Sequence, residues 1–166
     1  MVSRHNMVLD LCGADVITET LDSLWRGSRG KGEGRIKCTI TKHRLAKTAI
    51  VLGIKILSQK PPASIIKLAS EWAPLRKPGR PPRGVKKHSR TELVLECAST
   101  TGLLDGIDTV CRMTTGAVSH RRVAKTALYL GLDSMSKVEH AKVRQLISRV
   151  CPVPKKYWDP EVGEWL

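Results

Sequence analysis

The chain has 166 residues, of which 29 are Lys or Arg and 15 are Asp or Glu, so its formal net charge is +14. Such a basic composition favours a polyanionic partner, nucleic acid before an anionic membrane. The hydrophobic fraction of 41% excludes a disordered basic tail, and the low aromatic content of 4%, with no Phe, argues against RNA-binding sheets that stack bases on rows of rings.

Four helices are predicted in each half of the chain. Apolar residues recur at helical spacing, Thr41 and Ser119 are good N-caps, and Pro74 and Pro152 follow the last helix of each half. In chain order the predicted helices cover 6–12, 15–26, a segment that starts after Thr41 and ends near Gly53, 62–72, 91–99, 102–113, a segment that starts after Ser119 and ends near Gly131, and 136–150. Strand signals are weak, so the predicted fold class is all-α.

The two halves resemble each other in sequence. HRLAKTAIVLGI at 43–54 agrees closely with RRVAKTALYLGL at 121–132, and the offset from residue 46 to residue 124 is 78 positions. Upstream the offset is 86, as from Leu21 to Ile107, because the first copy carries a Gly-rich insertion at 27–34. We therefore predict two tandem helical units, at 6–75 and 92–153, a basic linker at 76–91, and a Trp-containing tail at 154–166 that docks on the protein or on a partner.

The segment GAVSHRRVAKTA at 116–127 resembles the turn and recognition helix of helix-turn-helix DNA-binding proteins. The first copy carries ITKHRLAKTA at the matching place. The resemblance implies that the start of each helix faces the major groove, where cationic side chains reach base edges and phosphates. The DNA-binding residues implied on the two helices are Lys42, His43, Arg44, Lys47, His120, Arg121, Arg122 and Lys125. An alternative is that Arg44 and Arg122 pair with Asp22 and Asp108.

The linker RKPGRPPRGVKKHSR at 76–90 has seven Lys or Arg residues and no acid, so we expect it to be extended. Gly79-Arg80-Pro81 resembles part of an AT-hook, which lies in the minor groove of A·T-rich DNA. The alternative is a tether that contacts phosphates without sequence preference. Its expected DNA-binding residues are Arg76, Lys77, Arg80, Arg83, Lys86, Lys87 and Arg90.

Five scattered cysteines without a C-x-x-C pair indicate neither a disulfide framework nor a zinc site. We expect no metal and no cofactor. No signal peptide and no apolar run of about 18–20 residues is found, so a cytoplasmic, nucleoid-associated protein without a membrane partner is predicted.

These features predict a non-enzymatic, sequence-specific double-stranded-DNA-binding protein, a transcriptional regulator of bacterial or phage type. Homodimerisation or contact with the transcription machinery stays open. One alternative is a structural RNA-binding component of a ribonucleoprotein. A second rests on GLLDGID at 102–108, which resembles the LAGLIDADG helix of homing endonucleases and would make Asp22 and Asp108 metal ligands.

Overall fold

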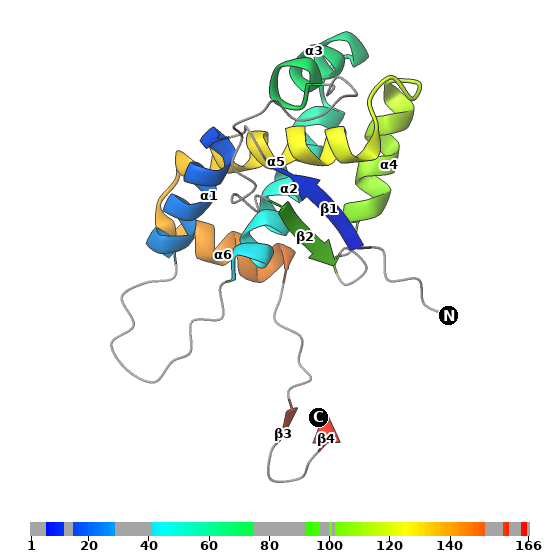
Figure 1. Ribbon diagram of the computed structural model, residues 1–166. Coiled ribbons are helices and arrows are strands. Elements are labelled where there is room, and N and C mark those ends of the chain that lie inside the picture. The colour runs from blue at the N-terminus through cyan, green and yellow to red at the C-terminus, as the bar shows by residue number, and fades with distance from the viewer. Residues whose placement is uncertain are drawn as a thin grey trace, which may run out of the picture.

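The computed structural model describes residues 6–11, 15–28, 41–74, 92–96, 100, 102–151, 158–159 and 164–165. Within these ranges the elements are six helices and four short strands (Figure 1). In chain order they are β1 Asn6–Asp10, α1 Asp15–Ser28, α2 Lys42–Ser58, α3 Pro62–Trp72, β2 Glu92–Glu96, α4 Leu103–Met113, α5 His120–Ser136, α6 His140–Val150, β3 Trp158–Asp159 and β4 Glu164–Trp165. The mostly helical architecture confirms the predicted fold class.

Two of the predicted helices are strands. Within the segments expected to be helical at 6–12 and 91–99, residues Asn6–Asp10 form β1 and Glu92–Glu96 form β2, and the two strands pair antiparallel with Val8 opposite Val94. The reason is that side-chain burial alternates along β2 with a period of two residues. Leu93 and Leu95 are buried while Val94 between them is 45% exposed, and such alternation in five residues suits a strand with one buried face.

The other helices lie close to their predicted positions. Helix α3 starts and ends where expected, whereas α6 begins at His140 rather than at 136. The N-caps are confirmed, because the Thr41 side chain accepts a hydrogen bond from the backbone N–H of Arg44, and that of Ser119 from Arg122. The expected ends at Gly53 and Gly131 are wrong, since α2 and α5 continue to residues 58 and 136.

Those two glycines lie where α2 and α5 cross. A Cβ atom on Gly53 would overlap the backbone of Ala127, and one on Gly131 would overlap the backbone of Ala49. The helices therefore touch backbone to backbone, which only a residue without a side chain permits. This crossing is the centre of the core, and Figure 1 shows α2 and α5 running through the middle of the helical body.

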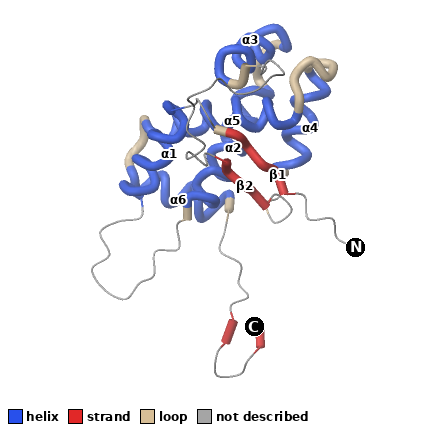
Figure 2. Tube along the Cα trace, viewed as in Figure 1, coloured by secondary structure: helices blue, strands red, loops and turns tan. Residues whose placement is uncertain are grey.

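One hydrophobic core contains residues from both halves of the chain. Leu9 and Leu95 of the two strands and Leu45, Leu57, Leu128 and Leu132 of the central helices belong to the same buried cluster. The β1–β2 ribbon packs through its buried leucines on this pair of helices, with β1 next to α5 and β2 next to α2 (Figure 2). The two halves thus fold around each other rather than around separate cores.

Several contacts come in pairs related by the two sequence offsets. Gly53 lies against Ala127, and the equivalent residues 78 positions away, Gly131 and Ala49, make the same contact. Val8 and Val94, which are equivalent under the offset of 86, face each other in the ribbon. A two-fold relation between the halves accounts for both observations. The origin of this relation in a tandem duplication stays a prediction.

Candidate nucleic-acid interface

The first turns of α2 and α5 carry the residues expected to bind DNA, and each of the two helices contacts one strand of the ribbon. Helix α2 contacts β2, and helix α5 contacts β1. Both helices begin with cationic or ionisable residues: Lys42 and His43 in α2, His120 and Arg121 in α5. Of these, His43, His120 and Arg121 are exposed, and Lys42 is partly exposed. A helix N-terminus also presents backbone N–H groups, so each of these turns suits an anion.

A cavity of about 220 Å³ lies between the start of α5 and the ribbon. Arg121, Arg122 and Lys125 line one side of it, and Asp10 of β1 lies on the other. Ala73 and Pro74, which follow α3, also line this cavity. The cationic start of α5, strand β1 and the end of the described segment 41–74 therefore line the same cavity.

Arg44 and Arg122 bind main-chain carbonyl groups. Arg44 donates from Nε and Nη2 to the carbonyl oxygen of Cys151, at 2.9 and 2.7 Å, and Arg122 donates from Nε to that of Ala73 at 2.8 Å. Each arginine thus secures the end of the last helix of the other half. This geometry differs from the expectation that both side chains face a groove.

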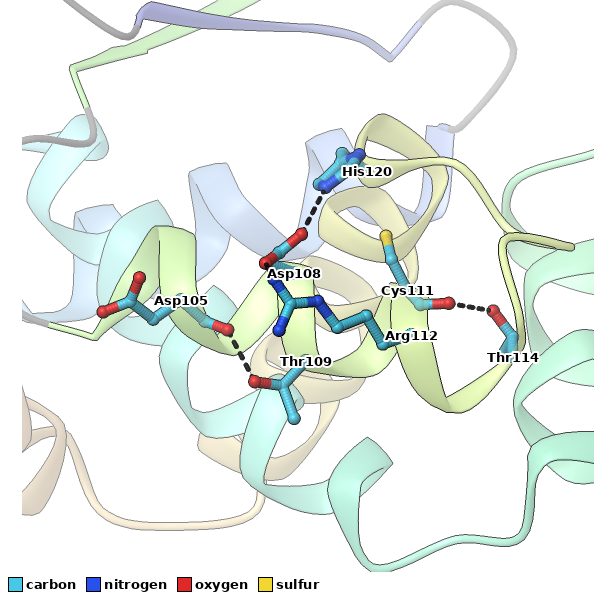
Figure 3. Close-up of polar contacts among 7 residues, drawn as sticks. All are labelled: Asp105, Asp108, Thr109, Cys111, Arg112, Thr114 and His120. Carbon is cyan, nitrogen blue, oxygen red and sulfur yellow. Dashed lines mark hydrogen bonds and ion pairs between the residues drawn. The ribbon is translucent and has the colours of Figure 1, made fainter.

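The predicted alternative partners of these arginines are also wrong. Asp22 pairs with Lys42, whose ammonium group lies 5.0 Å from the centroid of the Trp25 ring. Asp108 pairs with Nη2 of Arg112 at 2.8 Å and with Nε2 of His120 at 3.1 Å (Figure 3). The acid residues therefore hold the first residue of each helix rather than the arginine at its third position.

Lys47 and Lys125 were expected to be exposed, one turn after the start of each helix, and neither is. Lys47 is only 9% exposed, and Lys125 is half-buried at the cavity beside Asp10. The first two residues of each helix, Lys42, His43, His120 and Arg121, have side chains that are exposed or partly exposed. The seven linker residues, Arg76, Lys77, Arg80, Arg83, Lys86, Lys87 and Arg90, lie outside the described residues.

The charge of Asp108 also affects the thiol of Cys111. Cys111, one turn along α4, is 6% exposed, and burial, with a smaller effect of the Asp108 charge, raises the pKa of its thiol. Cys111 and Cys151 are both free and buried. A neutral, buried thiol is a packing group rather than a nucleophile.

The described residues contain no cluster of three or more His, Cys, Asp or Glu side chains that could hold a metal ion. Asp22 and Asp108, the acids implied by the endonuclease resemblance, are each bound to cationic partners. Among the helices of the described ranges, none has the length and apolarity needed to cross a membrane.

Sequence reasoning missed the ribbon. The only sequence signal was a pair of short apolar runs around Val8 and Val94, at positions related by the same offset of 86 that relates the two halves. Short apolar runs do not separate strand from helix by periodicity alone, and only the pairing of the two runs resolves them. The chain matches no protein-family model, no curated protein and no solved structure.

Proposed function

We propose that this protein binds double-stranded DNA through the face that carries the β1–β2 ribbon. The ribbon enters the major groove, and the first turns of α2 and α5 contact the phosphates on either side of that groove. The observation that carries the proposal is a two-stranded antiparallel ribbon in which each strand contacts a helix with a cationic first turn, and the first turn of α5 lines a cavity together with β1. A ribbon of this kind is one of the two elements that the major groove of B-DNA admits.

The same geometry favours DNA over structured RNA. The major groove of an A-form helix is deep and narrow, and side chains on a ribbon cannot read base edges there. Val8 and Val94, at the centre of the ribbon, are apolar. The methyl groups of thymine form an apolar surface in the major groove of DNA, and valine side chains can contact it. Competition between duplex DNA and structured RNA at one salt concentration distinguishes the two partners.

The ribbon is acidic, whereas the helix starts and the segment 76–90 are basic, so we expect them to contribute differently to DNA binding. In the ribbon, the Cα register pairs Asp10 with Glu92 and Asn6 with Glu96, so the strands carry acidic residues. Carboxylates next to a polyanion are unfavourable unless they accept hydrogen bonds, and the amino group of cytosine is the donor they prefer in the major groove. Affinity is then supplied by cations on the helix starts and in the segment 76–90, which contributes seven Lys or Arg and no acid.

In this proposal the recognition element is the ribbon, and the helices that resemble recognition helices position it. Under this proposal the protein is a transcriptional regulator that is associated with the nucleoid. The two helix starts contact phosphates, because the backbone N–H groups at a helix N-terminus donate hydrogen bonds to anions.

The test compares two single-charge variants of the same helix. Arg121→Ala removes an exposed cation at the start of α5, and Lys137→Ala removes one just after its end, where the side chain is 72% exposed and pairs with Asp133. We expect Arg121→Ala to weaken binding to every duplex and to reduce the slope of log K against log salt by about 0.9. Lys137→Ala should change neither quantity. Equal effects of the two variants would refute the proposed face.

A second variant tests the ribbon. Val94→Ser removes apolar surface from an exposed position at the centre of β2. If the ribbon reads bases, this variant loses affinity for a selected sequence and keeps its affinity for random duplex. Unchanged affinity for both would contradict base readout by the ribbon.

A further inference from the structure

Helix α6 has an exposed face that is cationic. Lys142, Arg144 and Arg149 are all exposed, and the described part of the chain provides no hydrogen-bond or ion-pair partner for these three side chains. The helix itself contains no Asp or Glu. The acid nearest in sequence is Glu139, which is the N-cap residue and lies at the end of the helix opposite to Arg149. The positive charge of this face is therefore available to a partner.

A shallow groove of about 660 Å³ runs along this face. Its lining consists of residues from α6, which are Ala141, Arg144, Gln145, Ser148 and Arg149. These residues recur at spacings of three and four, so they form one side of the helix. A site for a small molecule encloses most of its ligand. An open groove on a single helix suits instead an extended polyanion that passes over the surface.

Helix α3 is the equivalent of α6 in the first half of the chain, and it lacks these charges. At the buried positions both helices are apolar, with Ile65 and Ala69 in α3 and Val143 and Ile147 in α6. At three positions outside the core the residues of α6 are cationic and those of α3 are not: Lys142, Arg144 and Arg149 correspond under the offset of 78 to Ser64, Ile66 and Glu71. The same place in the fold thus accepts uncharged or acidic residues, so packing does not require the cations of α6.

The C-terminal end of α6 adjoins the first turn of α2. Arg44, in that turn, donates two hydrogen bonds to the carbonyl oxygen of Cys151, the residue that follows α6. The thiol of Cys151 also lies 3.9 Å from the hydroxyl of Thr100, which follows β2 in the chain. Figure 1 shows α6 at one edge of the helical body, beside α1 and α2. The last turn of α6, which contains Arg149, is therefore next to a helix start that the proposed function places on phosphates.

We propose that the exposed face of α6 binds the phosphate backbone of duplex DNA, next to the phosphates contacted by the first turn of α2. This inference rests on the proposed function and adds to it a surface outside the ribbon. Arg144 and Arg149 each contact a phosphate, for which the planar guanidinium group has matching geometry, and Lys142 adds positive charge beside them. Because phosphate contacts carry no sequence information, α6 raises the affinity for every duplex.

Two double variants of the full chain, matched in charge, test this proposal. Arg144→Gln with Arg149→Gln removes both arginines of the groove, whereas Lys55→Gln with Lys137→Gln removes two exposed cations at the C-terminal ends of α2 and α5. The affinity of each variant for one random-sequence duplex is measured over a range of salt concentrations.

We expect the α6 variant to reduce the slope of log K against log salt by about 1.8, since each lost phosphate contact contributes about 0.9. Between about 50 and 200 mM salt, the affinity of the unmodified protein should then fall about tenfold further than that of the variant. The control variant should keep the slope of the unmodified protein.

A conservative variant separates charge from packing. Arg144→Lys with Arg149→Lys keeps both charges, and lysine also binds phosphate, so this variant should keep the slope of the unmodified protein. A slope reduced as far as in the glutamine variant would overturn the proposed phosphate contacts. Circular dichroism of each variant checks that a change in affinity does not come from unfolding.

The outcomes separate this inference from the proposed function. Binding of the unmodified protein to no duplex refutes the proposed function itself. An unchanged slope in the α6 variant, while Arg121→Ala still reduces it, refutes the inference alone. An equal reduction in the control variant shows that only net charge matters, and it refutes the inference as well. If the α6 variant loses affinity for structured RNA and not for duplex DNA, the face binds a different partner and the proposal is overturned.

Discussion

The crossing of α2 and α5 gives the sharpest prediction about stability. Gly53→Ala and Gly131→Ala each add one methyl group inside a helix, and in an exposed helix this change stabilises by about 1 kcal/mol. Here the added Cβ overlaps the backbone of Ala127 or of Ala49. A backbone obstacle cannot change rotamer, so the helices must separate, and overpacking of this kind costs up to about 3 kcal/mol.

The net expectation is a loss of about 2 kcal/mol from the free energy of unfolding, the difference between these opposing effects. For a chain of this size, Tm should fall by about 4–8 °C. Thermal unfolding followed by circular dichroism measures this change. The double variant should cost less than the sum of the single variants, because helices already separated by the first methyl group leave room for the second.

Gly106→Ala is the matched control. Its added Cβ would lie 2.8 Å from Cγ2 of Ile54, which belongs to a side chain and not to the backbone. A smaller loss of stability is expected for this variant than for the two central ones. If Gly53→Ala and Gly131→Ala instead raise Tm, as helix propensity alone requires, the close crossing of α2 and α5 does not exist.

Three further predictions concern the packing around the interface. Arg44→Ala and Arg122→Ala should each lower the free energy of unfolding by about 1.5–3 kcal/mol in urea titrations, because each removes charged hydrogen bonds to a carbonyl group; no loss would mean that these arginines face solvent. Leu95→Ala should cost about 2–5 kcal/mol and Val94→Ala less than about 1 kcal/mol, and similar losses would contradict the alternation of β2. Iodoacetamide at pH 8 should leave Cys111 of the folded protein unlabelled in peptide mapping, since burial raises the pKa of its thiol; labelling as fast as in denaturant would show that the site is open.

The helices were largely predictable because their signals are local. Thr41, Ser119 and the proline that follows the last helix of each half act within one turn, so α3 and the starts of α2 and α5 lie where the sequence indicated. The strands were not predictable from their own residues. Five residues with apolar groups at Met7, Val8 and Leu9 fit a short helix as well as a strand, and the partner strand that decides between them is 86 positions away.

The roles of the basic residues depend on tertiary contacts. Nothing in the sequence around Arg122 reveals that the carbonyl of Ala73, 49 positions earlier, receives its guanidinium group. The same applies to Arg44 and Cys151. A cationic residue in the first turn of a helix is compatible with a phosphate contact, an ion pair or a carbonyl anchor, and only the position of the other half of the chain selects among them.

The intertwining of the two halves has a consequence for behaviour at low concentration. When helices that cross in this way belong to separate polypeptides, dilution shifts the equilibrium towards dissociated chains, and the melting temperature falls with the protein concentration. In this protein both helices are covalently connected, so a tenfold or hundredfold dilution leaves the folded population unchanged. A single copy in a cell would therefore be as well folded as a thousand.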